Sequence, residues 1–168
     1  YLDIEHGDWD ECCVKRLTDS NGRNYGWVVR DSFVTRLKAV EPDAMRRFQK
    51  ALHTKLQTGK GYLFFVDKAN RHRPQMYKDH GLEVVATNLC TEIMLHSSEE
   101  HTYSCILASL NLVHWDKIKS SDAAFVATVF LDCVCSEFVE MAKNVPGLEK
   151  VVRFTEQGRA IGLGVMGY

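Results

Sequence analysis

Helical stretches alternate with short apolar runs along this sequence, and the alternation sets its fold class. Residues 43–57 show helical periodicity between Pro42 and Gly59, residue types that start and stop helices. The run 61–66, Gly-Tyr-Leu-Phe-Phe-Val, predicts a strand buried on both faces. This order of elements predicts an α/β architecture. The apolar stripe of the helix consists of Ala44, Met45, Phe48, Leu52 and Leu56.

Other segments extend the same pattern. Residues 18–26 are polar and turn-rich, which predicts a loop, and residues 27–37 predict a short strand followed by a helix start. Strands or extended segments are predicted at 83–90, 93–95 and 103–107. Residues 122–143 predict a buried helix, with an inward face made of Phe125, Val129, Phe130, Cys133, Val134, Phe138 and Met141.

Composition excludes several classes of partner. The chain has 168 residues, 45% of them hydrophobic and 26% charged, as in one soluble domain or part of one. A net charge of −1 gives no field for attracting a polyanion, so no nucleic-acid partner is expected. The most apolar stretch, 123–135, is interrupted by Asp132 and is shorter than the roughly 20 residues that cross a bilayer, so no membrane partner is expected either. Both ends look truncated, since no leader precedes Tyr1 and a glycine-rich run meets Tyr168.

The six cysteines indicate a reducing, cytoplasmic setting, because a chain this rich in core residues needs no disulfides. The spacings at 12–13 and 133–135 do not match zinc-ribbon pairs, so no metal site is expected. Cys12, Cys13, Cys133 and Cys135 are therefore interpreted as structural. His72 and His96 lack ligand-spaced partners and are interpreted as loop or core histidines.

Three residues of different chemistry alternate within one predicted extended segment. Asn88, Cys90 and Glu92 would point to one face of it, which brings an amide, a thiol and a carboxylate together. Leu89 and Ile93 would shelter them from water, and desolvation could raise the pKa of Glu92 to suit a general base. The plainer interpretation makes Cys90 a small core residue and puts Asn88 and Glu92 on a solvated face, and spacing alone favours it.

Five segments together resemble the catalytic large subunit of ribonucleotide reductase. Residues 87–93, Thr-Asn-Leu-Cys-Thr-Glu-Ile, closely resemble the family's Ser-Asn-Leu-Cys-x-Glu-Ile signature. Residues 105–112 resemble its second cysteine segment, and residues 59–70 resemble its Gly-x-Ile-Tyr and Val-Asp-x-x-Asn element. Residues 158–167 resemble its Arg-x-Leu-Gly-x-Gly-Val stretch, and residues 2–6 match the start of a barrel segment. The resemblance covers essentially the whole chain.

This resemblance implies a fold. Residues 1–168 would be part of a ten-stranded α/β barrel, a partial catalytic domain truncated at both ends, with the radical cysteine on a loop threaded into the barrel. The glycines of 158–167 are interpreted as allowing close helix packing rather than cradling a nucleotide. An open part of a barrel would leave strand edges and apolar surface unpaired, so the isolated piece should be poorly stable or associate.

The resemblance also implies a role for each motif residue. Cys90 would carry a transient thiyl radical that takes the 3′ hydrogen of a ribonucleotide, and Glu92 would be the base at the 3′ hydroxyl. Asn88 would hydrogen-bond the sugar, and Leu89 would also line the substrate site. Cys105 would be one half of the redox dithiol, whose other cysteine the family places upstream of this chain.

The implied activity is reduction of ribonucleoside diphosphates to deoxyribonucleotides for DNA synthesis, with triphosphates as the open alternative. This segment would bind no cofactor directly. An iron-dependent small subunit, rather than adenosylcobalamin, would supply the radical. ATP and deoxynucleotide effectors would bind outside the segment, large subunits would pair as a homodimer, and thioredoxin or glutaredoxin would restore the dithiol. Alone, the segment should be inactive.

Two rival functions stay open. One is a non-catalytic split-gene segment that only assembles with complementary pieces. The other is a small thiol oxidoreductase that uses Cys90 and Cys105, although no Cys-x-x-Cys opens a predicted helix.

Overall fold

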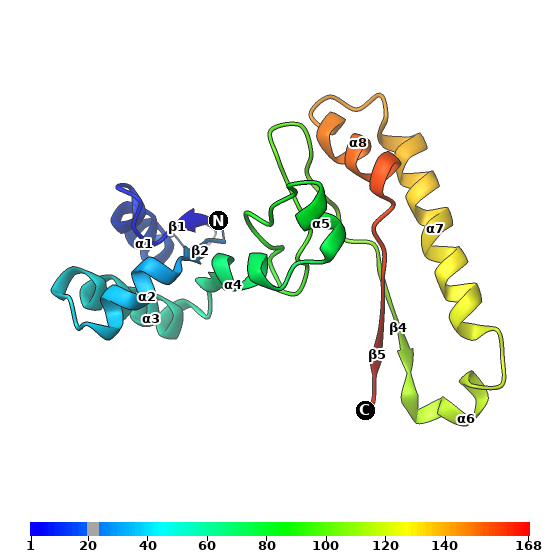
Figure 1. The fold of residues 1–168 in the computed structure, drawn as a ribbon, viewed down its shortest axis with the longest axis horizontal. Helices are drawn as coiled ribbons and strands as arrows, with labels where there is room; N and C mark the ends of the chain where they lie inside the picture. The colour runs from blue at the N-terminus through cyan, green and yellow to red at the C-terminus, as the bar shows by residue number, and fades with distance from the viewer. Residues whose placement is uncertain (20–23) are drawn as a thin grey trace. The chain divides into compact units, whose positions relative to one another are not determined.

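The computed structural model describes residues 1–19 and 24–168 and divides the chain into two compact units, residues 1–96 and 97–168 (Figure 1). Helices and strands alternate in both units, so the α/β prediction is confirmed. Residues 20–23 of the loop predicted at 18–26 lie outside the described residues. The first unit contains, in order, β1 (Leu2–Asp3), α1 (Trp9–Thr18), β2 (Gly26–Val29), α2 (Asp31–Lys38), α3 (Pro42–Thr58), β3 (Tyr62–Phe65), α4 (Val66–Arg71) and α5 (Gln75–Asp79).

The first unit is built on a parallel sheet with the strand order β1-β2-β3. All four residues of β2 are buried. Trp27 and Val29 belong to a cluster with α1, α2 and α3, while Val28 belongs to a second cluster that includes Phe64. The strand buried on both faces is therefore β2. The prediction had given that role to 61–66, but β3 pairs on one side only among the described residues, and Phe65 is 45% exposed.

Helix α3 has nearly the predicted bounds but a different buried face. Pro42 lies in its first turn, and Gly59 ends it with a φ of 68°, the left-handed conformation that glycine adopts without strain. Its buried residues are Ala44, Ala51 and Thr54, whereas the predicted stripe residues Leu52 and Leu56 are 38% and 86% exposed. Small side chains on the buried face let α3 pack closely on α1, and periodicity alone did not show this.

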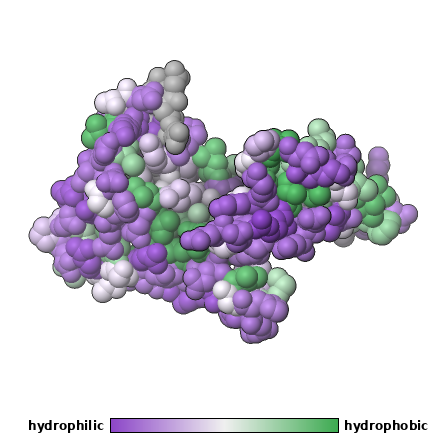
Figure 2. Space-filling view, turned by 90° about the horizontal axis from the view of Figure 1, so that it is seen from above, coloured by the Kyte–Doolittle hydropathy of each residue, from purple (hydrophilic) through white to green (hydrophobic). Residues whose placement is uncertain are grey.

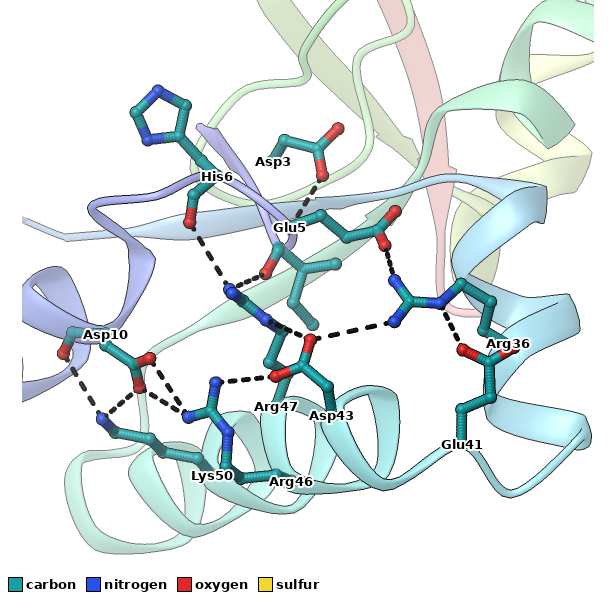
Figure 3. Close-up of polar contacts among 11 residues, drawn as sticks. Asp3, Glu5, His6, Asp10, Arg36, Glu41, Asp43, Arg46, Arg47 and Lys50 are labelled. Carbon is teal, nitrogen blue, oxygen red and sulfur yellow. Dashed lines mark hydrogen bonds and ion pairs between the residues drawn. The ribbon is translucent and has the colours of Figure 1, made fainter.

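A network of charged side chains joins α1, α3 and the end of β1 around this core (Figure 3). The Asp10 carboxylate accepts hydrogen bonds from Arg46, at 3.0 Å, and from Lys50, at 2.6 Å. Asp43 accepts from Arg46 at 2.9 Å and from Arg47 at 3.0 Å. Arg47 also donates to the carbonyl oxygen of Ile4 at 3.0 Å. The network continues through Glu5, Arg36 and Glu41.

This network predicts a pH-dependent contribution to stability. Hydrogen bonds from Arg46 and then Lys50 lower the pKa of Asp10 from 3.8 to about 2. A lowered pKa means that the contribution is full above about pH 4 and is lost as the pH falls through 2. Asp10→Asn should lower the free energy of unfolding at pH 7 by less than about 1 kcal/mol, as for other exposed pairs. Urea unfolding of both proteins at pH 7, 4 and 2.5 would measure it.

The matched control is Glu137→Gln, which neutralises an exposed carboxylate on helix α7 (Ala123–Ala142) of the second unit. The free energy of unfolding of Glu137→Gln should differ little from that of wild type at every pH. If Asp10→Asn changed the free energy of unfolding by the same amount at pH 7 and pH 2.5, the stabilising role of the ionised Asp10 carboxylate would be contradicted.

The second unit pairs two strands that are distant in sequence. It contains β4 (Leu107–Asn111), the 3-10 helix η1 (Leu112–His114), α6 (Trp115–Ile118), α7 (Ala123–Ala142), α8 (Glu149–Gly158) and β5 (Gly162–Met166). Strands β4 and β5 are parallel and lie side by side (Figure 1). In their register, Leu107 lies opposite Gly162. Leu131 and Cys135 of α7 pack on Ile106, just ahead of β4. No helix in the described ranges is long and apolar enough to cross a membrane.

Two predictions for this unit need correction. Helix α7 has nearly the predicted bounds, but Phe125, Phe130 and Met141 of its predicted inward face are 70%, 63% and 71% exposed. A two-stranded sheet covers only one stripe of this largely apolar helix. The closing glycine run forms strand β5, not a helix contact. A Cβ at Gly162 would lie 2.6 Å from Cδ2 of Leu107, so the glycine allows close packing between strands.

Hydrophobic residues reach the molecular surface (Figure 2), and on α7 they include Phe125, Val126, Val129, Phe130 and Met141. The 168-residue chain expressed by itself should therefore associate with itself, because exposed apolar surface of this extent favours burial. Sedimentation velocity should show a weight-average mass that rises with concentration, and Phe125→Glu with Phe130→Glu should weaken the rise. A monomer with a sharp thermal transition that does not depend on concentration would contradict this expectation.

Candidate functional site

The residues singled out from the sequence form a tight turn, the Cys90 turn, defined as residues 88–93. The amide of Thr91 donates to the carbonyl oxygen of Asn88 at 3.1 Å, and Thr91 has a φ of 67°. The prediction of an extended segment is therefore wrong. The Asn88 side chain explains the difference, because its Oδ1 accepts from the amides of Glu92, at 3.2 Å, and Ile93, at 3.0 Å. Such local bonds compete with strand formation.

The turn still brings two of the three predicted groups into contact. Asn88 Nδ2 donates to Glu92 Oε1 at 2.7 Å, and Cys90 lies between them in the turn. The predicted apolar shelter is absent from this part of the described chain. Leu89 is 49% exposed, and Cys90 and Glu92 are exposed, because a turn directs the residues at its tip toward solvent. An amide, a carboxylate and an accessible thiol on five consecutive residues can together bind a hydroxyl group, accept its proton and exchange a hydrogen atom.

The base of the turn is closed by a buried hydroxyl. Thr87 is 6% exposed, and its Oγ1 donates to the carbonyl oxygen of Ile93 at 2.7 Å. This bond joins the two arms that enter and leave the Cys90 turn. The sequence placed Thr87 inside the motif but gave no sign of this role.

Tyr1 also contacts the Cys90 turn. Its phenol donates to the carbonyl oxygen of Asn88 at 3.1 Å and lies 3.4 Å from the hydroxyl of Thr91. Burial raises the pKa of this phenol above its usual 10.0, so it remains a donor at neutral pH. The ring meets Phe64 edge-on and lies directly over Gly26, where a Cβ would come within 2.2 Å of it. No local pattern predicted this contact, because Tyr1 and Asn88 are far apart in sequence.

A cavity of about 400 Å³ adjoins the turn. Thr91 and Met94 contribute to its wall, together with apolar residues of β3 and the cationic side chains Lys68 and Arg73. His72, interpreted from the sequence as a loop or core residue, also lines this cavity.

The other cysteines differ in exposure. Cys105 is exposed in the second unit, ahead of β4, and so belongs to a different unit from Cys90. Cys13 and Cys135 are buried, as expected of structural cysteines, and burial raises the pKa of both thiols. Cys12 is partly buried. Cys133 is exposed, so the interpretation that it packs in a core is wrong among the described residues: it falls on the side of α7 that β4 and β5 leave open.

Comparison with known proteins gives consistent matches. A model of the family described as "Ribonucleotide reductase, barrel domain" matches residues 6–168. The chain is 34% identical over 126 residues to the ribonucleoside-diphosphate reductase large subunit of Invertebrate iridescent virus 3. This match covers 74% of this chain and 20% of the relative. It is 36% identical over 137 residues to the ribonucleoside-diphosphate reductase subunit alpha of Chlamydia trachomatis, covering 78% of this chain and 12% of the relative.

A solved structure matches over nearly the full length. The class Id ribonucleotide reductase alpha subunit of Actinobacillus ureae superimposes with a TM-score of 0.90 and 45% sequence identity over 99% of this chain. The match covers 32% of that subunit. The chain thus spans about a third or less of the length of these relatives.

The contact of Tyr1 with the turn predicts a measurable stabilisation. Tyr1→Phe keeps the ring over Gly26 but removes the hydrogen bond to the Asn88 carbonyl, and should lower the free energy of unfolding by about 0.5–1.5 kcal/mol. The matched control is Tyr168→Phe, because Tyr168 is fully exposed. Urea denaturation would compare the variants, and equal midpoints for Tyr1→Phe and wild type would argue against the contact.

Proposed function

We propose, because the chain belongs to the ribonucleotide reductase large-subunit family, that it is the part of such a subunit that reduces ribonucleotides through a radical on Cys90. The observation that carries the proposal is the Cys90 turn. In a chain of this family, it holds the amide of Asn88 2.7 Å from the carboxylate of Glu92, with the Cys90 thiol between them in sequence. We propose ribonucleoside diphosphates as substrates, since relatives are named ribonucleoside-diphosphate reductases.

Each group in the turn suits one part of the reaction. After a radical-generating partner removes a hydrogen atom from the Cys90 thiol, the thiyl takes the 3′ hydrogen of the ribose and becomes a thiol again. Glu92 accepts the proton of the 3′ hydroxyl. Asn88 hydrogen-bonds the sugar, with Leu89 beside it, and keeps the 3′ carbon within reach of the sulfur. The hydrogen bond between Asn88 and Glu92 would open when the sugar hydroxyls take its place.

The remaining steps balance atoms and electrons. The 2′ hydroxyl leaves as water, and a dithiol supplies the two electrons and two protons that this loss requires. Cys105 is proposed as one member of that dithiol, paired with a cysteine of the large subunit outside this chain. The dithiol becomes a disulfide, Cys90 returns the hydrogen atom to the 3′ carbon, and Glu92 returns the proton. Thioredoxin or glutaredoxin would reduce the disulfide by thiol exchange.

The partners of the whole subunit belong to the same proposal. A small subunit that contains a metal would generate the radical, with adenosylcobalamin as the alternative source, and two large subunits would form a homodimer. ATP and deoxynucleotide effectors would bind outside these residues, and the reaction would take place in the cytoplasm. No described residue of this chain is assigned to a cofactor.

The decisive test is turnover by the full-length large subunit that contains this chain. Cys90→Ser and Cys90→Ala should fold, bind nucleotide and form no deoxyribonucleotide above background, because neither side chain can carry the thiyl radical. The matched control is Cys133→Ser, which changes another exposed cysteine and should stay close to wild type. Each candidate radical source is supplied separately, together with a dithiol reductant. The source that supports wild-type turnover identifies the class of ribonucleotide reductase to which the subunit belongs.

Turnover by Cys90→Ser would make Cys90 a packing or surface residue and would remove the mechanistic assignment. Loss of activity in Cys133→Ser as well would point to damage that is not specific to the Cys90 turn.

A further inference from the structure

The segment that carries the Cys90 turn runs without strand pairing. Residues 82–93 form no helix or strand, so the backbone bonds that would fix a strand in place are absent along this part of the described chain. A segment of this kind needs other anchors if a side chain on it is to be held to a fraction of an ångström. One such anchor is a side chain on α4.

Asn70 supplies both hydrogen bonds that a neighbouring strand would otherwise supply. Its Nδ2 donates to the carbonyl oxygen of Val84 at 2.8 Å, and its Oδ1 accepts from the amide of Val84 at 3.0 Å. Two residues that face each other in an antiparallel sheet exchange the same pair of bonds. Here one side-chain amide replaces the partner strand.

The Asn70 amide also makes two hydrogen bonds to residues close to it in sequence. Nδ2 makes a second bond to the carbonyl oxygen of Val66, at 3.1 Å, and Oδ1 accepts a second bond from Arg73, at 3.1 Å. A primary amide has two donors and two acceptor lone pairs, and all four are used here. Only Asn and Gln carry a primary amide among the standard side chains, and Gln is one methylene longer, so the position is chemically specific.

The anchored residue connects the core to the turn. Val84 is 1% exposed and packs with Val28, Phe64, Val66 and Tyr77, the cluster on one face of β2. Three residues separate it from Asn88, where the Cys90 turn begins. Beyond the turn, the amide of His96 donates to the phenol of Tyr77 at 3.4 Å, so the segment is tied to the same cluster on its far side.

We infer that Asn70 is a positioning residue for the Cys90 turn: by clamping the backbone of Val84, it sets where Asn88, Cys90 and Glu92 lie relative to the sheet. This inference rests on the proposed function. Asn70 does not contact the reacting groups and acts only through Val84 and the chain that follows. Losing the clamp should therefore displace the reacting groups without removing any of them.

The test uses Asn70→Ala and Asn70→Asp in the full-length subunit. Alanine removes all four bonds, while aspartate keeps the acceptor for the Val84 amide but sets a carboxylate against the carbonyl oxygens of Val84 and Val66. Both should lower kcat by about 10- to 100-fold, as small misplacements of reacting groups do, with KM changed by less than about threefold. Hydrogen exchange should become faster in the peptide 82–95 of both variants.

The structural control is Thr54→Ala. Thr54 is fully buried in α3, and its hydroxyl donates to the carbonyl oxygen of Lys50 at 2.9 Å, so its loss destabilises the first unit away from the turn. Thr54→Ala should lower the Tm by an amount comparable to that of Asn70→Ala. It should leave kcat and hydrogen exchange at 82–95 near the wild-type values. A fall in kcat for Thr54→Ala that matches Asn70→Ala would show general destabilisation and overturn the inference.

Two further outcomes separate the inference from the function on which it rests. If Cys90→Ser is inactive but both Asn70 variants keep wild-type kcat, the positioning role is wrong and the function stands. If Cys90→Ser turns over, the proposed function fails, and the positioning role fails with it.

Discussion

Strand β2 is buried on both faces, and the first unit is organised around that constraint. Because side chains alternate along a strand, Trp27 and Val29 pack in the cluster with α1, α2 and α3, while Val28 packs in the cluster that contains Val84. One strand thus ties the helical layer to the segment that bears the Cys90 turn. The ion network at the edge of the helical layer adds to this arrangement but lies outside the apolar clusters.

Much of the framework could be predicted from the sequence, and the reasons are local. Helices α3 and α7 were located to within a residue or two because their periodicity is long and Pro42 and Gly59 mark the ends of α3. The buried faces were wrong because burial depends on neighbouring elements: Leu56 is exposed since α3 meets α1 through alanines. Helices α1 and α8 and strand β1 were not predicted. The glycines of 158–167 were interpreted as allowing close helix packing, because β4, the strand that pairs with 162–166, lies far away in the sequence.

The candidate site was predicted from its motif rather than from its geometry. Alternation predicted that Asn88 and Glu92 lie together, and their hydrogen bond confirms it, but the conformational reason was wrong, since a side-chain amide folds the segment into a turn. The contacts of Tyr1 with the turn and of Asn70 with Val84 could not be predicted, because each joins residues that are distant in sequence. The apolar residues exposed on α7 lie on the side of the helix that β4 and β5 leave open.

The parallel pairing of β4 with β5 has a consequence for the order of folding during synthesis. A ribosome completes β4 at Asn111 and makes its partner only from Gly162 onward, after α7 and α8. At roughly 5–20 residues per second, β4 waits several seconds without a partner. The core of Ile106, Leu131 and Cys135 also lacks Leu163 during that time. The second unit therefore closes late, and its nascent helices must remain soluble until the last strand emerges.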